Sequence, residues 1–428
     1  MKKTFTLLFL IVFLLPGCSL QSNFENEVKV VEESVSYHYT APWNKDFFDR
    51  FYQDLKLEKD LPIIKGGIVP HHLLAGYLDA SFFENLKKQN PSTIVVLGPN
   101  HFYKGYSKII SSEYDWHTPY GDLTTNRGMI ANLATKRIIN IEEDVINDEH
   151  SIYGILPFIK KSLPDAQVLP FIFKGDIDEE QMDNFVNYLL EVVPSDTVFV
   201  SSIDFSHYQT LNVANFHDEL SIDVIKSFDF ANLDKLEIDS VPSLYILLKI
   251  MEKYKTQKVV LEKHDNSAKM IGDSSADNTT SYYSPYFSKG EKTEKNLTSF
   301  MLLGNADMSE EEVISLRRDL AGNEDRFLFG FDYLWPEKDE IPDEIVEVVE
   351  GNDIFDYFAK SDKEKINFAI GGILYKDGSS KFYVFPFVFE DDKAVRLEYV
   401  DAQNFVKDLF AKNNIKDYNI DEFSFVIQ

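Results

Sequence analysis

The amino-acid sequence predicts a three-layer α/β domain with a mainly parallel central sheet, followed by a C-terminal α+β module. Two observations lead to this fold class. Apolar runs of strand length alternate with helical patterns as far as about residue 263, which is typical of a parallel sheet covered by helices. From about Ser288 the pattern changes to neighbouring strand-like runs around the turn Asp377-Gly378, which favours antiparallel pairing.

The spacing of apolar residues predicts the elements of the α/β domain. Helical spacing occurs at residues 45–57, 73–89, 126–136, 152–163, 177–193, 213–227, 233–236 and 241–254. Strand-like runs occur at residues 67–72, 93–101, 138–141, 167–173, 197–203 and 258–263. The segments 102–122 and 265–281 are predicted as loops, and loops that follow strand ends often form the walls of a site.

The C-terminal module is predicted from a second set of runs. Strands are expected at residues 299–303, 366–374, 381–389 and 394–399, and a helix at 402–413. The module contains no histidine. We therefore predict a structural role for it, or the binding of a protein partner.

Composition limits the classes of function. With 428 residues, 44% of them hydrophobic, the chain has enough material for a large core and for two domains. Its formal net charge of -28 repels polyanions, so we expect no nucleic-acid partner. We interpret the acidity as a contribution to solubility.

The N-terminus predicts export and a lipid anchor. Residues 1–18 have a basic start and an apolar run that is too short to span a membrane, ending at Cys18, the only cysteine. The end of this run resembles a bacterial lipobox, although Pro16 is unusual there. The segment is thus predicted as a lipoprotein signal peptide with a lipidated Cys18, an uncleaved anchor being the alternative. Both place the globular part outside the cytoplasmic membrane, attached to it.

The remaining boundaries follow from this assignment. Residues 19–45 are polar and acidic and are predicted to be a tether. Residues 46–288 form the predicted α/β domain, and residues 289–428 form the C-terminal module.

Histidines stand at the ends of the first two predicted strands. One run ends in His71 and His72 and the next in His101, with Pro70 and Pro99 stopping the strands. Parallel strands end at the same edge of a sheet, where α/β proteins bind ligands. The pattern indicates a metal or proton-transfer site, and capping or core-edge histidines are the alternative.

Two further histidines strengthen the site interpretation. The strand at 197–203 is followed by His207, the third strand end with this feature. His150 precedes the helix predicted at 152–163, which Asp148 or Ser151 could cap. Glu149 suits the positive end of the same helix, so His150 is the residue that capping leaves unexplained.

These motifs resemble, in order, the signature blocks of the MEMO family, often called AmmeMemoRadiSam system protein B in bacteria. The blocks are V-P-H at 69–71, G-P-N-H at 98–101, D-E-H-S at 148–151 with L-P-F at 156–158, and S-S-I-D-F-S-H-Y at 201–208. The resemblance covers roughly residues 62–287. It implies a fold similar to that of class III extradiol dioxygenases.

The resemblance also implies a mononuclear metal site, with iron or copper held by His71 and His101 and with His150 and His207 lining the same pocket. The usual P-H-A-G-Y block carries extra residues here, so His72 is an alternative to His71. Asp239 aligns with the third ligand of the family, commonly a cysteine, within one or two residues. The alternative role of Asp239 is to cap the helix at 241–254.

Two histidines and a carboxylate form the ligand set of non-heme Fe(II) sites. We therefore expect a divalent metal ion, iron before manganese, zinc or copper. His207 and His150 would transfer protons, and Asp204 or Glu149 would orient an imidazole. These roles predict a metal-dependent oxidoreductase resembling a dioxygenase, or a hydrolase, with an unidentified small-molecule substrate. The alternative is a surface lipoprotein that binds metal or ligand without catalysis.

Overall fold

The computed structural model describes residues 36–40, 44–273, 276, 278–303, 333–334, 367–377, 379–390, 393–396, 399–412, 416, 418–420 and 425–427. The predicted signal peptide with Cys18 lies outside the described residues, as does most of the predicted tether. Among the helices described, none has the length and the hydrophobicity needed to cross a bilayer.

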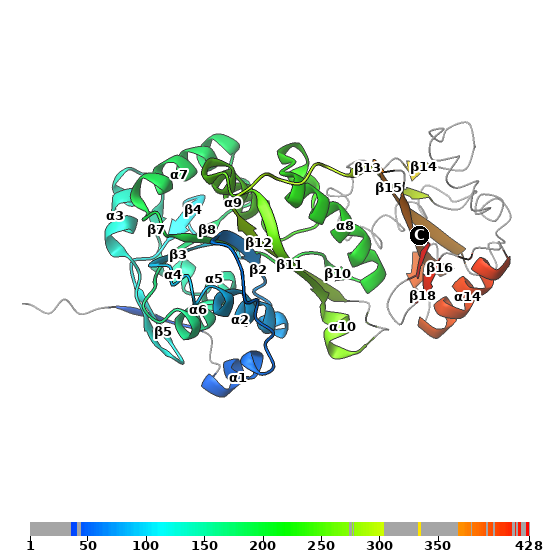
Figure 1. The fold of residues 1–428 in the computed structure, drawn as a ribbon, viewed down its shortest axis with the longest axis horizontal. Coiled ribbons are helices and arrows are strands. Elements are labelled where there is room, and N and C mark those ends of the chain that lie inside the picture. Colours follow the sequence, from blue (N-terminus) through cyan, green and yellow to red (C-terminus); the bar gives the residue numbers. More distant parts are fainter. Residues whose placement is uncertain are drawn as a thin grey trace, which may run out of the picture. The chain divides into compact units, whose positions relative to one another are not determined.

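A large mixed sheet forms the centre of the α/β domain (Figure 1). In the described part of the chain its strands are β2 (Ile64–Val69), β3 (Thr93–Pro99), β4 (Ile109–Ser111), β7 (Asn140–Ile141), β8 (Gln167–Phe173), β9 (Val198–Ser202), β10 (His207–Gln209), β11 (Lys258–Asn266) and β12 (Thr279–Ser288). Their order is β10-β12-β2-β9-β3-β8-β4-β7, and β11 pairs with β12. The central strands β2, β9, β3 and β8 are parallel, and β12 and β4 flank them in antiparallel pairing.

Helices cover both faces of this sheet. They are α1 (Lys45–Asp49), α2 (Gly76–Asn85), α3 (Arg127–Thr135), α4 (Glu143–Ile146), α5 (His150–Tyr153), α6 (Leu156–Ser162), α7 (Glu179–Val192), α8 (Leu211–Ser227), α9 (Val241–Tyr254) and α10 (Ser267–Ile271), with 3-10 turns η1 (Arg50–Tyr52), η2 (Leu73–Ala75) and η3 (Phe230–Lys235). Two separate apolar cores, one with α7 and α9 and the other with α2 and α6, lie against the strands. This arrangement confirms the predicted α/β class.

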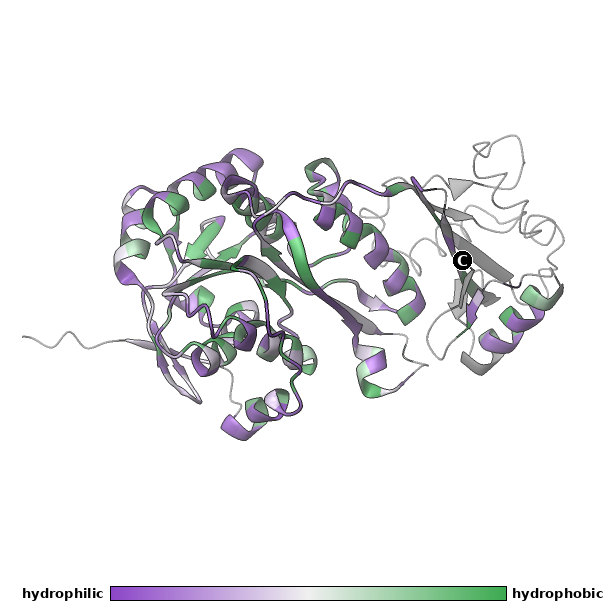
Figure 2. Cartoon of the chain, in the orientation of Figure 1, coloured by the Kyte–Doolittle hydropathy of each residue, from purple (hydrophilic) through white to green (hydrophobic). Residues whose placement is uncertain are grey.

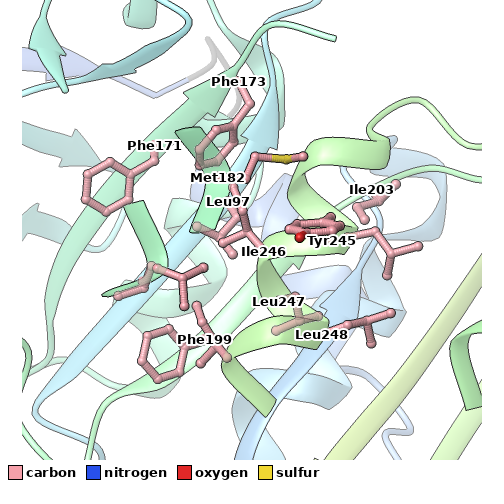
Figure 3. Close-up of a cluster of buried hydrophobic side chains, with 14 of the residues drawn as sticks. Leu97, Phe171, Phe173, Met182, Phe199, Ile203, Tyr245, Ile246, Leu247 and Leu248 are labelled. Carbon is pink, nitrogen blue, oxygen red and sulfur yellow. The ribbon is translucent and has the colours of Figure 1, made fainter. Parts of the chain in front are cut away.

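The core around α9 shows how the sheet and the helices hold together (Figure 3). Buried side chains of β3, β8 and β9 pack against consecutive residues of α9; the figure labels Leu97, Phe171, Phe173, Met182, Phe199, Ile203, Tyr245, Ile246, Leu247 and Leu248. Helix α7 buries Met182, Phe185, Val186 and Leu189, spaced so that they share one face. Hydrophobic and hydrophilic residues accordingly alternate along α7 in Figure 2.

Polar residues cap several helices of the α/β domain. Asn126 accepts a hydrogen bond from the backbone of Met129 at the start of α3, and Asp178 caps α7 in the same way. Helix α9 begins at Val241 as predicted, but its cap is Ser240, which accepts from the backbone N–H of Ser243. Asp239 is therefore not the cap of this helix.

Two segments predicted as loops contain strands. Residues 102–122 hold β4 together with β5 (Asp115–Thr118) and the start of β6 (Gly121–Leu123), and β5 pairs with the N-terminal strand β1 (Tyr37–Tyr39). The loop prediction for 265–281 is wrong at α10 and at the start of β12. The polar residues of β12 are buried because their hydroxyl groups are hydrogen-bonded; for example, Ser284 Oγ donates to the carbonyl of Ile68 at 2.8 Å.

The described part of the C-terminal region contains short antiparallel strands and a helix. Its elements are β13 (Leu297–Leu303), β14 (Tyr333–Leu334), β15 (Asn367–Tyr375), β16 (Ser380–Glu390), β17 (Lys393–Arg396), α14 (Tyr399–Lys412), β18 (Tyr418–Ile420) and β19 (Phe425–Ile427). Strand β15 pairs antiparallel with both β13 and β16. The predicted α+β character is confirmed.

Candidate metal centre

The site forms where the parallel strands end. His71 follows β2, His101 follows β3 and Asp204 follows β9, so the topology delivers all three to one edge of the sheet. Helix α5 packs tightly on the end of β3, because a Cβ atom at Gly98 would lie 2.6 Å from Ser151 Oγ. That contact brings α5, which begins at His150, to the same edge.

His71 lies between two carboxylates and is almost fully buried. Its Nε2 is 3.1 Å from Asp239 Oδ2 and 3.5 Å from Asp204 Oδ2. Its Nδ1 lies 3.2 Å from Ser202 Oγ, and its backbone N–H donates to Asp204 Oδ1 at 3.1 Å. The ring is thus held on both sides, with Nε2 directed at the carboxylates.

His101 is oriented by the buried carboxylate of Glu149. Its Nδ1 donates to Glu149 Oε1 at 2.7 Å, and its backbone N–H donates to Oε2 at 2.9 Å. Glu149 also caps α5 by accepting from the backbone of Ser151, so the prediction that Asp148 or Ser151 forms this cap is wrong. With Nδ1 engaged, His101 directs Nε2 at Asp239 Oδ2, 3.6 Å away. Metal-binding histidines are commonly oriented in this way.

Asp239 carries the most informative atom of the site. Its Oδ2 accepts the backbone N–H of Asp204 at 3.1 Å and faces both imidazoles. Its Oδ1 is buried and has no hydrogen-bond partner among the described residues. Buried polar atoms normally have a hydrogen-bond partner. A cation bound beside Asp239 would give Oδ1 a partner and would lie near the ring nitrogens of His71 and His101.

His150 completes a cluster of three imidazoles. Its ring stacks on that of His101, with centroids 4.2 Å apart, and meets His71 edge-on at 5.1 Å. One nitrogen from each of these histidines lies within 4.8 Å of the others. We call His71, His101 and His150 the histidine cluster. A second group that meets the same criterion is His71, Asp204 and Asp239.

Among the described residues, His72 and His207 belong to neither of these groups. His72 Nδ1 is hydrogen-bonded to the hydroxyl of Tyr282, and its neighbour His71 takes the position that faces the carboxylates. His207 opens β10 and pairs with Thr280. In the described part of the chain, neither group of candidate ligands includes His207, and its assignment as a general acid/base stays a prediction.

Ser202 is a site residue that the sequence analysis missed. The hydroxyl of Ser202 is hydrogen-bonded to His71 Nδ1. The hydroxyl of the adjacent Ser201 instead donates to the carbonyl of Ser243 at 2.8 Å. Successive residues of a strand face opposite sides of the sheet. Counting back in steps of two from Asp204 would have identified Ser202.

The carboxylates raise the pKa of two imidazoles. Burial lowers the pKa of His101, but hydrogen bonds to Asp239 and Glu149 outweigh it and raise the pKa to about 10. Burial also opposes charge on His71, yet the charges of Asp204 and Asp239 raise its pKa. Burial and the electrostatic effects of His71 and His101 instead lower the pKa of His150 to about 4. A metal ion would replace the protons on His71 and His101 as the balancing positive charge.

The fold and the site define an α/β protein with a buried cluster of histidine and aspartate residues that could hold a metal. A family model described as "Memo-like protein" matches residues 36–284. The chain therefore belongs to the Memo-like family.

Relatives from archaea agree with this assignment. A "MEMO1 family protein" of Metallosphaera sedula is 28% identical over 224 residues, covering 49% of this chain and 78% of the relative. A "MEMO1 family protein" of Methanosarcina mazei is 29% identical, covering 50% and 82%. One of Methanococcoides burtonii is 34% identical, covering 38% and 62%. The similarity lies in about half of the present chain.

Proposed function

We propose that this protein is a lipid-anchored, extracytoplasmic member of the Memo-like family that binds one divalent metal ion through His71, His101 and Asp239. The observation that carries the proposal is the convergence of two imidazole nitrogens on one oxygen of Asp239 while its other oxygen has no partner among the described residues. Asp204 and His150 lie beside these ligands.

The donor set favours iron. Two imidazoles and a carboxylate suit non-heme Fe(II), and manganese, zinc and copper are the alternatives. A bound ion would supply a Lewis acid with positions open to a substrate. Glu149 would hold His101 in the tautomer that leaves Nε2 for the metal.

The protein's own residues supply the proton transfers in this proposal. His150 is neutral at pH 7 because its pKa lies at about 4, so it is able to accept a hydrogen bond or a proton from a substrate. His207 is the proposed second general acid/base. Asp204 orients His71, because its carboxylate accepts the backbone N–H of His71 and lies 3.5 Å from the Nε2 of the His71 ring. We propose that the reaction is metal-dependent and either oxidative or hydrolytic.

Metal content tests the site. We would measure metals by elemental analysis in the full chain and in His71→Ala, His101→Ala and Asp239→Ala variants, with His264→Ala as a control outside the site. We expect near-stoichiometric iron, manganese, zinc or copper in the parent and in the control, and its loss in the three variants. An Asp239→Ala variant that retains the metal would overturn the proposed ligand set.

Turnover and attachment are tested separately. A metal-loaded protein that converts neither catechols nor esters would favour binding without catalysis. The lipid anchor is supported by the apolar N-terminal run and the single Cys18. Mass spectrometry of the mature N-terminus should show a lipidated Cys18, and a Cys18→Ala variant should leave the membrane fraction.

A further inference from the structure

A hollow of about 610 Å³ lies beside the histidine cluster. It is lined by Tyr39, Thr40, Phe102, Lys104, Asn147, Asp148 and Tyr153. Phe102 directly follows His101, and its ring centroid is 6.4 Å from that of His150; the ring of Tyr153 is 6.5 Å from the same histidine. The hollow, which we call the aromatic hollow, therefore adjoins the candidate metal centre on the side of His150.

One wall of the aromatic hollow comes from the N-terminal strand β1. Tyr39 belongs to this strand, which pairs with β5, and its side chain is 69% exposed. The neighbouring His38 is buried: its Nε2 lies 2.7 Å from Glu143 Oε2 and its ring packs on Trp116. These contacts hold β1 in place, so Tyr39 is presented by a firmly attached strand.

The hollow already holds an ammonium group of the protein itself. Lys104 Nζ lies 5.1 Å from the centroid of the Phe102 ring and 3.0 Å from Asp148 Oδ2. An aromatic face beside a carboxylate is a favourable environment for a cation. Both charged side chains are about half exposed, so the ion pair between them is weak and open to exchange.

The charge of the surroundings favours a cationic ligand over an anionic one. Glu142, Glu143 and Asp144 directly precede the segment that carries Asp148, and the whole chain has a net charge of -28. Such a field concentrates cations and repels anions. Burial and the charges of Glu149 and Asp148 raise the pKa of Tyr153, so its phenol ring stays neutral.

We propose that the aromatic hollow binds an organic amine, whose ammonium group takes the place of Lys104 between Phe102 and Asp148 and whose other end faces His150. The amine would be the substrate class of the metal centre, a role that rests on the proposed function. Binding itself does not depend on that function. A carboxylate ligand paired with Lys104 is the opposite outcome.

A pair of ligands with the same ring and opposite charge tests the proposal. The full chain would be titrated with tyramine and with 4-hydroxyphenylacetate by calorimetry, at low and at high salt. We expect tyramine to bind roughly fivefold or more tightly than the acid, and the difference to shrink at high salt. Equal affinities, or tighter binding of the acid, would overturn the proposal.

Matched variants locate the site. Asp148→Asn and Tyr39→Ala should each weaken tyramine binding by roughly threefold to fivefold. Asp144→Asn and Tyr106→Ala are the controls, because both residues line a separate hollow. Tyr106→Ala should leave the affinity unchanged, and Asp144→Asn should lower it less than Asp148→Asn does, because it weakens only the general field. If Asp148→Asn or Tyr39→Ala binds tyramine as the parent does, the aromatic hollow is not the binding site.

Metal content measured on the same samples separates the two proposals. A protein that retains its metal but shows no preference for tyramine contradicts only the amine site. A protein that prefers tyramine but holds no metal supports the amine site and contradicts the proposed metal centre.

Discussion

Two buried aspartates near the same region of the sheet, Asp218 and Asp239, have opposite surroundings. Asp218 Oδ1 accepts from Ser281 Oγ at 2.8 Å and from Ser206 Oγ at 3.3 Å, and its Oδ2 accepts from His264 Nε2 at 2.7 Å. Asp239 faces two imidazoles with one oxygen, and its other oxygen has no hydrogen-bond partner in the described part of the chain. A carboxylate with every acceptor filled stabilises the fold, whereas one with a vacant acceptor beside imidazoles is suited to a metal.

A third buried aspartate shows that a vacant acceptor alone is not sufficient. Neither oxygen of Asp79 has a hydrogen-bond partner among the described residues. Burial, together with the charge of Asp204, raises the pKa of Asp79 well above its usual range, which favours the neutral acid. Asp239 differs because His71 and His101 outweigh the effect of burial and lower its pKa. A charged carboxylate attracts a cation more strongly than a neutral carboxylic acid does.

The largest effect should follow from breaking the filled network. Replacing Asp218 by alanine leaves His264 and two serine hydroxyls without their common acceptor, and we expect a loss of about 3–5 kcal/mol in the free energy of unfolding. Urea unfolding of the metal-free protein measures it. Metal bound per folded chain should stay at the parent value, and a selective loss of metal would break the comparison.

Asp239→Ala should have the converse effect. We expect metal affinity to fall by at least about 100-fold, equivalent to about 2.7 kcal/mol, because the variant removes one of three proposed ligands. Competition with a fluorescent chelator measures the affinity. An affinity equal to that of the parent would show that the vacant oxygen does not mark a ligand.

Glu149→Gln sharpens the comparison. Both oxygens of Glu149 accept hydrogen bonds, and one of them accepts from Nδ1 of the proposed ligand His101. The amide retains the shape but loses the charge beside His101 Nδ1. We expect metal affinity to fall by about 10-fold to 100-fold, as for other residues that orient metal ligands. The same chelator competition, compared with Asp148→Asn as a control on an exposed neighbour, separates orientation of His101 from a general loss of negative charge.

The smallest effect depends on pH. Burial lowers the pKa of His264, but the hydrogen bond and the charge of Asp218 outweigh it and raise the pKa. The stabilisation is therefore fully present below the unfolded pKa of about 6.5 and is lost as the pH rises through the folded value. His264→Gln should cost about 1 kcal/mol at pH 6 and less at pH 9, as measured by urea unfolding. An equal cost at both pH values would contradict a charged pair.

Much of the fold was predictable from local patterns. The strand at 167–173 and the helix at 241–254 have the bounds that the apolar spacing predicts, because their lengths and apolar residues are typical of a buried strand and of a mostly buried helix. No strand was predicted where β12 lies. Its first residues fell in a predicted loop because Thr279 and Ser281 are polar, and they are buried only through hydrogen bonds to other segments.

The sequence by itself determined that histidines reach the site edge. His71 and His101 end parallel strands, and strands of that kind end at the same edge of a sheet. The blocks around these residues also indicated the family that residues 36–284 match. Both inferences need only neighbouring residues and a general rule of topology.

Only the tertiary structure decided which of two adjacent histidines faces the carboxylates. It also decided which aspartate is suited to a metal and which one stabilises the fold. His71 and His72 are consecutive and point to different partners. Asp239 lies two residues before α9 and Asp218 lies within α8. Their roles differ because of contacts with distant segments: His71 and His101 for Asp239, His264 and Ser281 for Asp218. Charge, burial and hydrogen-bond saturation are set by such contacts, which no local pattern contains.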